Sequence, residues 1–528
     1  MLKKWTLAVA LASVAALMVV WAADTPSDLK TVVDGSMKAM GAESVKTLVI
    51  SGEGFETCVG QEPNWHTGWW RRYSDKQYVR SIDFEAKAWR LQRIRGEGEP
   101  NGHGGCGTTN PTPEAEQTQV TNLTTNPNAA WSAAQCCGSK LDYILLPEAF
   151  LKTALERNAT VKPQTIKGKK FTVVEFMGEN KAPVDGYINQ QGYVEKVETK
   201  IDINPFGDQV FDAVYTEWKD FGGVKFPAHI VENQGDLKYF ELNVTDVKAN
   251  APVDLTPPPA RGGRGGRGGP GGAKGGDGKG GGKNAAKGGA KGGPGGGGRG
   301  AQAVASEDLG DGFWLVTGGY GSVIANFKNY IVVIEGPQSE ARADAIIGQA
   351  KMLIPNKPIK YVINTHTHTD HSGGLRRFVA EGATIVTSQV NKGFYEHMLK
   401  YPHALVPDKM QGMNPQPKIK VEYVGESRKM TDGEHEIDIY HVDNSLHADD
   451  MLMIYLPKQK ILMEADEFNV PGQVRTAPPA TINTYQTNLM ANIDRLKLDI
   501  DRIIPIHLPG DNRKVAFSEL KMEIGRTN

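Results

Sequence analysis

Apolar residues in the first half of the chain follow two periods, one after the other. Leu29, Val32, Val33, Met37 and Met40 stand near helical spacing, which predicts a short helix over residues 27–40. Beyond it, apolar and polar residues alternate, and strands are predicted over 47–52, 69–73, 170–177, 184–189, 193–203, 209–218, 224–232 and 239–247. Residues 97–135, rich in Gly, Thr, Asn and Pro, are expected to form a long loop. We therefore expect a mainly antiparallel β domain over residues 24–255.

The apolar pattern disappears between residues 256 and 300. Arg-Gly-Gly repeats and Lys-Gly-Gly units fill this segment, which holds nine Lys or Arg and one Asp. Such a composition cannot bury enough surface to offset its conformational entropy, so we expect a flexible basic linker, and the flanking domains need not pack together. RNA, anionic lipid and wall polymer are alternative partners for such a segment. A secreted protein meets little RNA, so no nucleic acid is expected; contact of the basic linker with the envelope or an anionic polymer is the alternative to a simple tether.

The apolar pattern returns over residues 301–528 with strands and helices in alternation. Strands are predicted over 313–316, 322–325, 330–334, 359–363 and 384–386, and helices over 341–353 and 374–380. This order predicts an α/β domain built around βαβ units. With 528 residues the chain is long enough for about three units in all, which fits a β domain, a linker and an α/β domain.

Three histidines and one aspartate lie within six residues, directly after the predicted strand 359–363. They are His366, His368, Asp370 and His371. In an extended segment alternate side chains point the same way, so the first two imidazoles can converge on one point and the next two residues on a second point nearby. Imidazole and carboxylate suit zinc, iron or manganese, and Gly373 and Gly374 let the backbone pass close behind. A histidine-rich surface loop is the less favoured alternative.

This stretch, His366-Thr367-His368-Thr369-Asp370-His371, resembles the His-x-His-x-Asp-His signature of the metallo-β-lactamase superfamily. The resemblance covers about residues 308–528 and implies a four-layer αββα fold with a mono- or dinuclear metal site. The fold expected for the whole chain is therefore this α/β fold, preceded by the mainly antiparallel β domain.

Three later residues match the remaining ligands of the family. His447 follows the predicted strand 436–442 and stands ten residues before Pro457, as the family's third-ligand histidine does. His441 competes with it but lies inside an alternating strand. Asp466 ends the strand 460–466 and matches the bridging aspartate, although Glu464 and Glu467 flank it. His507 ends the strand 502–507 and resembles the final ligand.

The resemblance then implies a complete ligand set. His366, His368 and His447 would hold one metal; Asp370, His371 and His507 would hold a second; Asp466 would bridge them. Two zinc ions per chain are expected, with iron or manganese as alternatives, and Asp370 is the expected catalytic residue because it can also orient the hydroxide. A ligand set with a bridging aspartate resembles that of the glyoxalase II, lactonase and phosphodiesterase branches more than that of the true β-lactamases, which lack this aspartate.

The N-terminus and the cysteines indicate the compartment. A charged Met1-Leu2-Lys3-Lys4, an apolar run from Trp5 to Trp21 and the small Ala22-Ala23 predict a signal peptide over residues 1–23 rather than an uncleaved anchor. A periplasmic or secreted protein is therefore expected, with its cysteines paired. Because a vicinal Cys136–Cys137 bridge would be strained, Cys58 and Cys106 are each expected to pair with one of these two, in either combination.

The expected function is that of a secreted metal-dependent hydrolase. It would use a metal-activated hydroxide on an ester, thioester, lactone or related bond of a small-molecule substrate. A periplasmic metallo-β-lactamase acting on β-lactams is one alternative. A chiefly ligand-binding envelope protein, using the β domain, is another. Tyr395, His397 and His403 are candidate pocket walls, with an ordinary surface helix and loop as the alternative.

Overall fold

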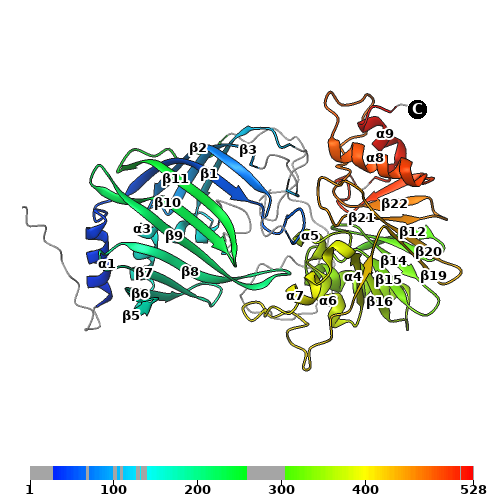
Figure 1. Ribbon diagram of the computed structural model, residues 1–528, viewed down its shortest axis with the longest axis horizontal. Helices are drawn as coiled ribbons and strands as arrows, with labels where there is room; N and C mark the ends of the chain where they lie inside the picture. The colour runs from blue at the N-terminus through cyan, green and yellow to red at the C-terminus, as the bar shows by residue number, and fades with distance from the viewer. Residues whose placement is uncertain are drawn as a thin grey trace, which may run out of the picture.

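The computed structural model shows two domains joined side by side (Figure 1). It describes residues 28–66, 70–98, 104–106, 111–126, 131, 139–258, 304–511 and 513–526. The predicted signal peptide 1–23 and most of the predicted linker 256–300 lie outside the described residues. None of the helices in the described ranges is long and apolar enough to cross a membrane.

The N-terminal domain is built on one antiparallel sheet of eleven strands, so the predicted β domain is confirmed. The strands run in the spatial order β4-β3-β2-β1-β11-β10-β9-β8-β7-β6-β5. Their bounds are β1 Thr47–Thr57, β2 Arg72–Asp83, β3 Ala88–Glu97, β4 Ala115–Asn122, β5 Thr160–Ile166, β6 Lys169–Met177, β7 Pro183–Ile188, β8 Val194–Ile203, β9 Gly207–Phe221, β10 Val224–Gln234 and β11 Leu237–Ala249.

Three helices, α1 Leu29–Ala39, α2 Lys140–Ile144 and α3 Pro147–Glu156, pack onto this sheet and share its core. The first helix begins at Asp28, whose carboxylate accepts a hydrogen bond from Thr31 N, a typical N-cap. Val32, Val33 and Met37 form its buried face, as the helical spacing predicts.

Strands β3, β4 and β5 are absent from the sequence prediction, and β4 lies within the residues predicted to be loop. Their side chains explain the difference. Arg93 in β3 is buried because it pairs with Glu56 and Asp75, and β4 and β5 are largely exposed strands at or near the sheet edges with few apolar residues. Buried ion pairs and polar edge strands carry no alternation of apolar residues, so the pattern does not reveal them.

The predicted cysteine pairing is wrong. Cys58, directly after β1, is bonded to Cys106, and their Cα atoms are 6.2 Å apart, within the usual range for a disulfide. The antiparallel meander β1-β2-β3 brings the end of β1 back beside the segment that follows β3, so these two cysteines meet although 48 residues separate them. Cys136 and Cys137 lie outside the described residues.

The C-terminal domain contains two sheets. The first has seven strands in the order β12-β13-β14-β15-β16-β17-β18 and the second has six, in the order β19 to β24. The first comprises β12 Ala305–Gly310, β13 Phe313–Thr317, β14 Ser322–Asn326, β15 Ile331–Ile334, β16 Ile359–Ile363, β17 Thr384–Ser388 and β18 Val421–Val424. The second comprises β19 Ser427–Thr431, β20 Glu436–His441, β21 Leu452–Leu456, β22 Ile461–Glu464, β23 Arg502–Pro505 and β24 Val515–Ala516.

Helices cover the outer face of each sheet, which confirms the predicted four-layer αββα fold (Figure 1). Helices α4 Glu340–Leu353, α6 Leu375–Ala380 and α7 Phe394–Met398 share a core with the seven-stranded sheet. Helices α8 Thr484–Leu496 and α9 Phe517–Glu523 pack with the six-stranded sheet, and apolar side chains of both sheets fill the space between them. Short helical segments α5 Thr369–Ser372 and η1 Gln389–Asn391 complete the domain.

The two domains pack together although a long linker would allow them to separate. The β8–β9 hairpin reaches the C-terminal domain (Figure 1), where Phe206 at its tip joins the core of the seven-stranded sheet and its helices. Asp202 pairs with His403 at 2.8 Å, and Asp208 N donates to Pro402 O at 2.8 Å. Apolar burial and polar contacts therefore both join the domains.

Peptide mapping without reduction tests the disulfide. A protease that cuts after glutamate places Cys106 in a different peptide from Cys136 and Cys137, because Glu114 and Glu116 lie between them. Cys136 and Cys137 are adjacent and stay in one peptide. We expect mass spectrometry to find the peptide of Cys58 joined to that of Cys106. A peptide of Cys58 joined to the one that holds Cys136 and Cys137 would contradict the structure.

Candidate metal centre

Strand ends from both sheets meet at one edge of the C-terminal domain and place the predicted ligands there. The loop after β16 carries His366 and His368, and the loop between β20 and β21 carries His447. Strands β22 and β23 run parallel with Glu464 opposite Pro505, so Asp466 and His507 each follow two residues later at the same edge. Leu452 N donates to Thr365 O at 2.8 Å and ties the sheets together there.

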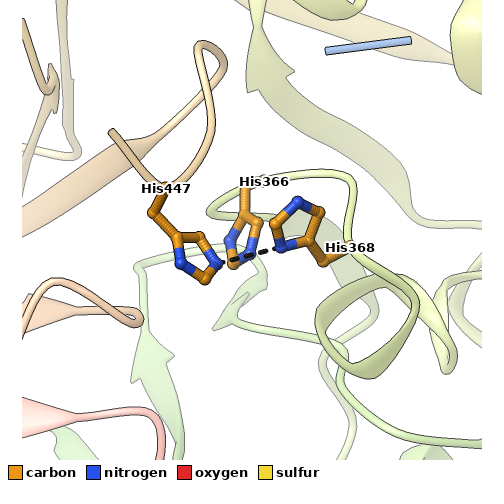
Figure 2. Close-up of side chains that lie close together, drawn as sticks. All are labelled: His366, His368 and His447. Atoms are coloured by element: carbon orange, nitrogen blue, oxygen red, sulfur yellow. Dashed lines mark hydrogen bonds between the residues drawn. The ribbon is translucent and has the colours of Figure 1, made fainter. Parts of the chain in front are cut away.

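One group consists of three buried histidines, His366, His368 and His447 (Figure 2). One nitrogen of each ring lies within 4.8 Å of one nitrogen of each of the others. His447 Nε2 and His368 Nδ1 are 3.0 Å apart and face each other. The three imidazoles thus present nitrogen lone pairs to one small space, as a metal requires.

The second group consists of Asp370, His371, Asp466 and His507, again with ligand atoms within 4.8 Å of one another. Asp466 lies between the two groups. Its Oδ2 is 2.7 Å from His371 Nε2, 3.6 Å from His366 Nε2 and 3.5 Å from His447 Nε2, and its Oδ1 is 2.9 Å from His507 Nε2. The structure therefore brings all seven predicted residues into two adjoining groups that share one carboxylate.

A buried nitrogen of the first group has no hydrogen-bond partner in the protein, which is an observation that fits a metal. His366 Nε2 is such an atom, and it points to the shared space of the first group. Leaving a buried polar atom unpaired costs about 1–3 kcal/mol, so natural proteins seldom do so without a reason. A cation in this shared space would give His366 Nε2 its partner.

The histidines of the first group are held neutral. Burial lowers the pKa of His368 to about 4 and that of His447 to about 3, and burial together with the neighbouring histidines lowers the pKa of His366 well below its ordinary value. Neutral imidazole is the form that binds a metal, so these side chains are ready to do so at neutral pH.

The second group is held charged. Burial would raise the pKa of Asp466, but His507 and His371 outweigh it and keep that pKa well below the ordinary value. Asp370 has a lowered pKa for the same reason, with His371 as the main opposing neighbour. Asp466 also adopts φ 59°, a left-handed conformation that a residue other than glycine seldom adopts. Such strain is typical of residues held for function.

The structure adds supporting residues that the sequence analysis missed. Glu335, directly after β15, accepts a hydrogen bond from Thr365 N at 3.2 Å and lies 3.5 Å from His371 Nδ1. Asp450 accepts one from Thr367 N at 2.8 Å. Glu335 directly follows a predicted buried strand, and an acidic residue at that position was a signal that could have identified it. Nothing in the sequence distinguished Asp450 from its neighbour Asp449.

The residues that competed for the ligand positions of His447 and Asp466 do not take those positions. Among the described residues, His441 belongs to neither group. Glu464 accepts hydrogen bonds from the backbone of Glu467 and Phe468, and Glu467 accepts one from Ser445, so neither replaces Asp466.

The three residues predicted as candidate pocket walls are not among the predicted ligands. Tyr395 is buried and donates a hydrogen bond to Asn364, at the start of the loop that carries His366 and His368. His397 is exposed and contacts Tyr401. His403 is buried against Asp202 of the N-terminal domain. None of the three residues belongs to the two groups of predicted ligands.

The family model of the metallo-beta-lactamase superfamily matches residues 338–507. Solved structures similar to this chain include a metallo-beta-lactamase from Pontibacter korlensis, with 17% identity, a TM-score of 0.33, and coverage of 43% of this chain and 99% of that one. They also include the FIM-1 metallo-beta-lactamase of Pseudomonas aeruginosa in its mono-zinc form, with 16% identity, a TM-score of 0.30, and coverage of 42% and 92%. No curated protein sequence matches the chain.

The family match and the sheet topology together assign the C-terminal domain. This domain has the metallo-β-lactamase fold, and residues 338–507 within it match the family model of the metallo-beta-lactamase superfamily. The residues matched, 338–507, include all seven members of the two groups. The N-terminal β domain lies outside the match.

Acidification of the metal-free protein tests the burial of His447. The unfolded chain takes up a proton at this histidine near pH 6.5, whereas the folded protein does so only near pH 3. At pH 7 both states are mostly unprotonated at this histidine. As the pH falls through about 6.5 the unfolded state alone gains the proton, so the free energy of unfolding falls. We expect the metal-free His447→Gln variant to gain roughly 2 kcal/mol relative to wild type between pH 7 and pH 5. Chemical denaturation at each pH measures this, and a difference that does not change with pH would contradict it.

Proposed function

We propose that the C-terminal domain is a dinuclear metal-dependent hydrolase in which His366, His368 and His447 hold one ion. Asp370, His371 and His507 hold the second, and Asp466 bridges the two. The single observation that carries this proposal is the position of the Asp466 carboxylate, with Oδ2 2.7 Å from His371 Nε2 and 3.6 Å from His366 Nε2. Zinc suits these nitrogen and oxygen donors best, and iron or manganese would also be accepted.

A pair of divalent ions, when bound, supplies a hydroxide at neutral pH and polarises the oxygen of the bond that is cleaved. In the metal-free protein the three histidines of the first group are neutral and the carboxylates of the second group are ionised, as metal binding needs. Neighbouring carboxylates outweigh burial and raise the pKa of His371 and of His507, so these two histidines release a proton when a metal binds. Asp370 accepts hydrogen bonds at both oxygens, from Gln61 Nε2 at 2.8 Å and from Tyr320 OH at 3.1 Å. A carboxylate restrained in this way can orient the attacking hydroxide.

The substrate proposed is a small molecule with an ester, thioester, lactone or related bond. A carboxylate between the two groups supports the branches that cleave such bonds over the β-lactamases, whose sites lack that bridge. A periplasmic or secreted location is supported by the Cys58–Cys106 disulfide, because disulfides persist mainly in oxidising compartments. Contact of the basic linker with an anionic envelope polymer remains part of this proposal.

Substitution of Asp466 tests the dinuclear centre. We expect Asp466→Ala to lower the metal content of the full-length protein from about two ions towards one, and hydrolysis of the best substrate to fall by orders of magnitude, because both ions share this ligand. His507→Ala should remove the second ion and leave the first in place. Metal analysis by mass spectrometry, with a panel of ester, thioester, lactone, phosphodiester and β-lactam substrates, measures both effects.

His441→Ala is the matched control, since this histidine lies in β20 and in neither group. It should retain both ions. If Asp466→Ala also retains two ions, or if His441→Ala loses metal as His447→Ala does, the ligand assignment is wrong.

A further inference from the structure

A segment of the N-terminal domain, Cys58–Trp65, lies directly against the candidate metal centre; we refer to it as the wall segment. Its backbone carbonyls meet groups of the C-terminal domain one after another. Gly60 O accepts a hydrogen bond from Thr369 N at 3.2 Å, and Pro63 O accepts one from Asp449 N at 2.7 Å. A side chain at Gly60 would have its Cβ 2.2 Å from Thr369 Cγ2, so only glycine permits this approach.

The wall segment determines which nitrogen of His368 carries the proton. Glu62 O lies 2.8 Å from His368 Nε2, and a carbonyl oxygen can only accept, so Nε2 must be the donor. The lone pair of this neutral imidazole is then on Nδ1, the atom 3.0 Å from His447 Nε2 in the first group. A backbone atom of one domain thereby prepares a ligand of the other.

The wall segment also restrains Asp370. The Gln61 amide donates to Asp370 Oδ1 at 2.8 Å, while Tyr320 OH donates to Oδ2 from the C-terminal domain. The two donors hold the carboxylate from opposite domains and limit its rotation. Gln61 is only 9% exposed, so this hydrogen bond is shielded from competing water.

Covalent and polar contacts hold the wall segment in place. The disulfide joins Cys58 to Cys106, and Gly105 N donates to Gln61 O at 3.3 Å. The fully buried Arg71 donates to Gly104 O at 2.7 Å and to Tyr485 OH at 3.2 Å, which connects this region to helix α8. These contacts make the segment a fixed part of the site.

Exposure differs between the two groups of the site. His366 and His368 are fully buried, and the side chain of His447 is 4% exposed. By contrast the side chain of Asp370 is 32% exposed and that of His507 is 16% exposed. The exposed edge of the centre therefore lies at Asp370 and His507, where the centroid of the Tyr320 ring is 4.1 Å from that of the His507 imidazole.

The geometry points to a metal centre shared by both domains, in which Gln61 is a positioning residue for Asp370 and Glu62 O positions His368. The wall segment would also restrict substrate approach to the side of Asp370 and His507. This inference rests on the proposed function, because Asp370 and His368 matter here as metal ligands. It assigns to the N-terminal β domain a direct part in the chemistry of a site that the family match confines to the other domain.

Metal affinity of full-length variants tests this inference separately from activity. Gln61→Met keeps the size of the side chain but removes the donor to Asp370. Gln164→Met, on the exposed strand β5 of the same domain, is the matched control. Metal-free proteins are titrated with zinc in competition with a chromophoric chelator, and the His507→Ala variant identifies which dissociation constant belongs to the second site.

We expect Gln61→Met to raise the dissociation constant of the second site by about tenfold, because partners of metal ligands have effects of this size, and to leave the first site unchanged. Gln164→Met should match wild type at both sites. The absorption spectrum of the cobalt-substituted protein should also change in Gln61→Met, which a loss of stability alone would not cause. If Gln61→Met binds both ions with the dissociation constants of wild type and gives the same cobalt spectrum, the positioning role is overturned.

Two further outcomes are distinguishable from this one. Wild-type protein that binds no metal would overturn the proposed function, and this inference with it. Nitrogen chemical shifts of the metal-free protein, with His368 assigned by a His368→Gln variant, should show His368 protonated at Nε2. A proton on Nδ1 would overturn the role of Glu62 while leaving the dinuclear proposal intact.

Discussion

The contact of the Asp466 carboxylate with imidazoles from both groups is the interaction on which the site depends. Five histidines in one small space would repel one another if charged, and an unpaired buried nitrogen such as His366 Nε2 is costly if left alone. One ionised carboxylate, 2.7 Å from His371 Nε2 and 2.9 Å from His507 Nε2, compensates the second group and reaches the first. In this arrangement the backbone of Asp466 is in the left-handed conformation. The paired ends of β22 and β23 fix the position of this residue.

The αββα fold supplies the positions that this interaction requires. Parallel strands place their carboxyl ends at a common edge, so the residues after β22 and β23 become neighbours although 40 residues lie between them in sequence. The hydrogen bond between Leu452 N and Thr365 O joins the second sheet to the loop of the first. Apolar side chains make up the core between the sheets, which leaves the polar groups free to gather at the edge.

Much of this domain could be predicted from the sequence because its signals are local. The run from His366 to His371 follows a buried apolar strand, and strand β16 was predicted with the bounds that the structure has. Residues such as Gln61 and Glu62 could not be predicted, since they lie some 300 positions away along the chain from the side chains they contact. The pairing of Cys58 with Cys106 depends in the same way on how three strands fold back, and spacing alone does not contain that information.

A metal centre built by both domains, as proposed, would give the close packing of the N-terminal domain a functional reason. The position of the ions is then the central claim. The most direct measurement is a crystal structure of the zinc-loaded full-length protein with anomalous scattering at the zinc edge. The account predicts two peaks, one bound by His366, His368 and His447 and the other by Asp370, His371 and His507. The carboxylate of Asp466 should bind both, and Gln61 should still contact Asp370. A single peak, or two peaks without Asp466 as a shared ligand, would contradict it.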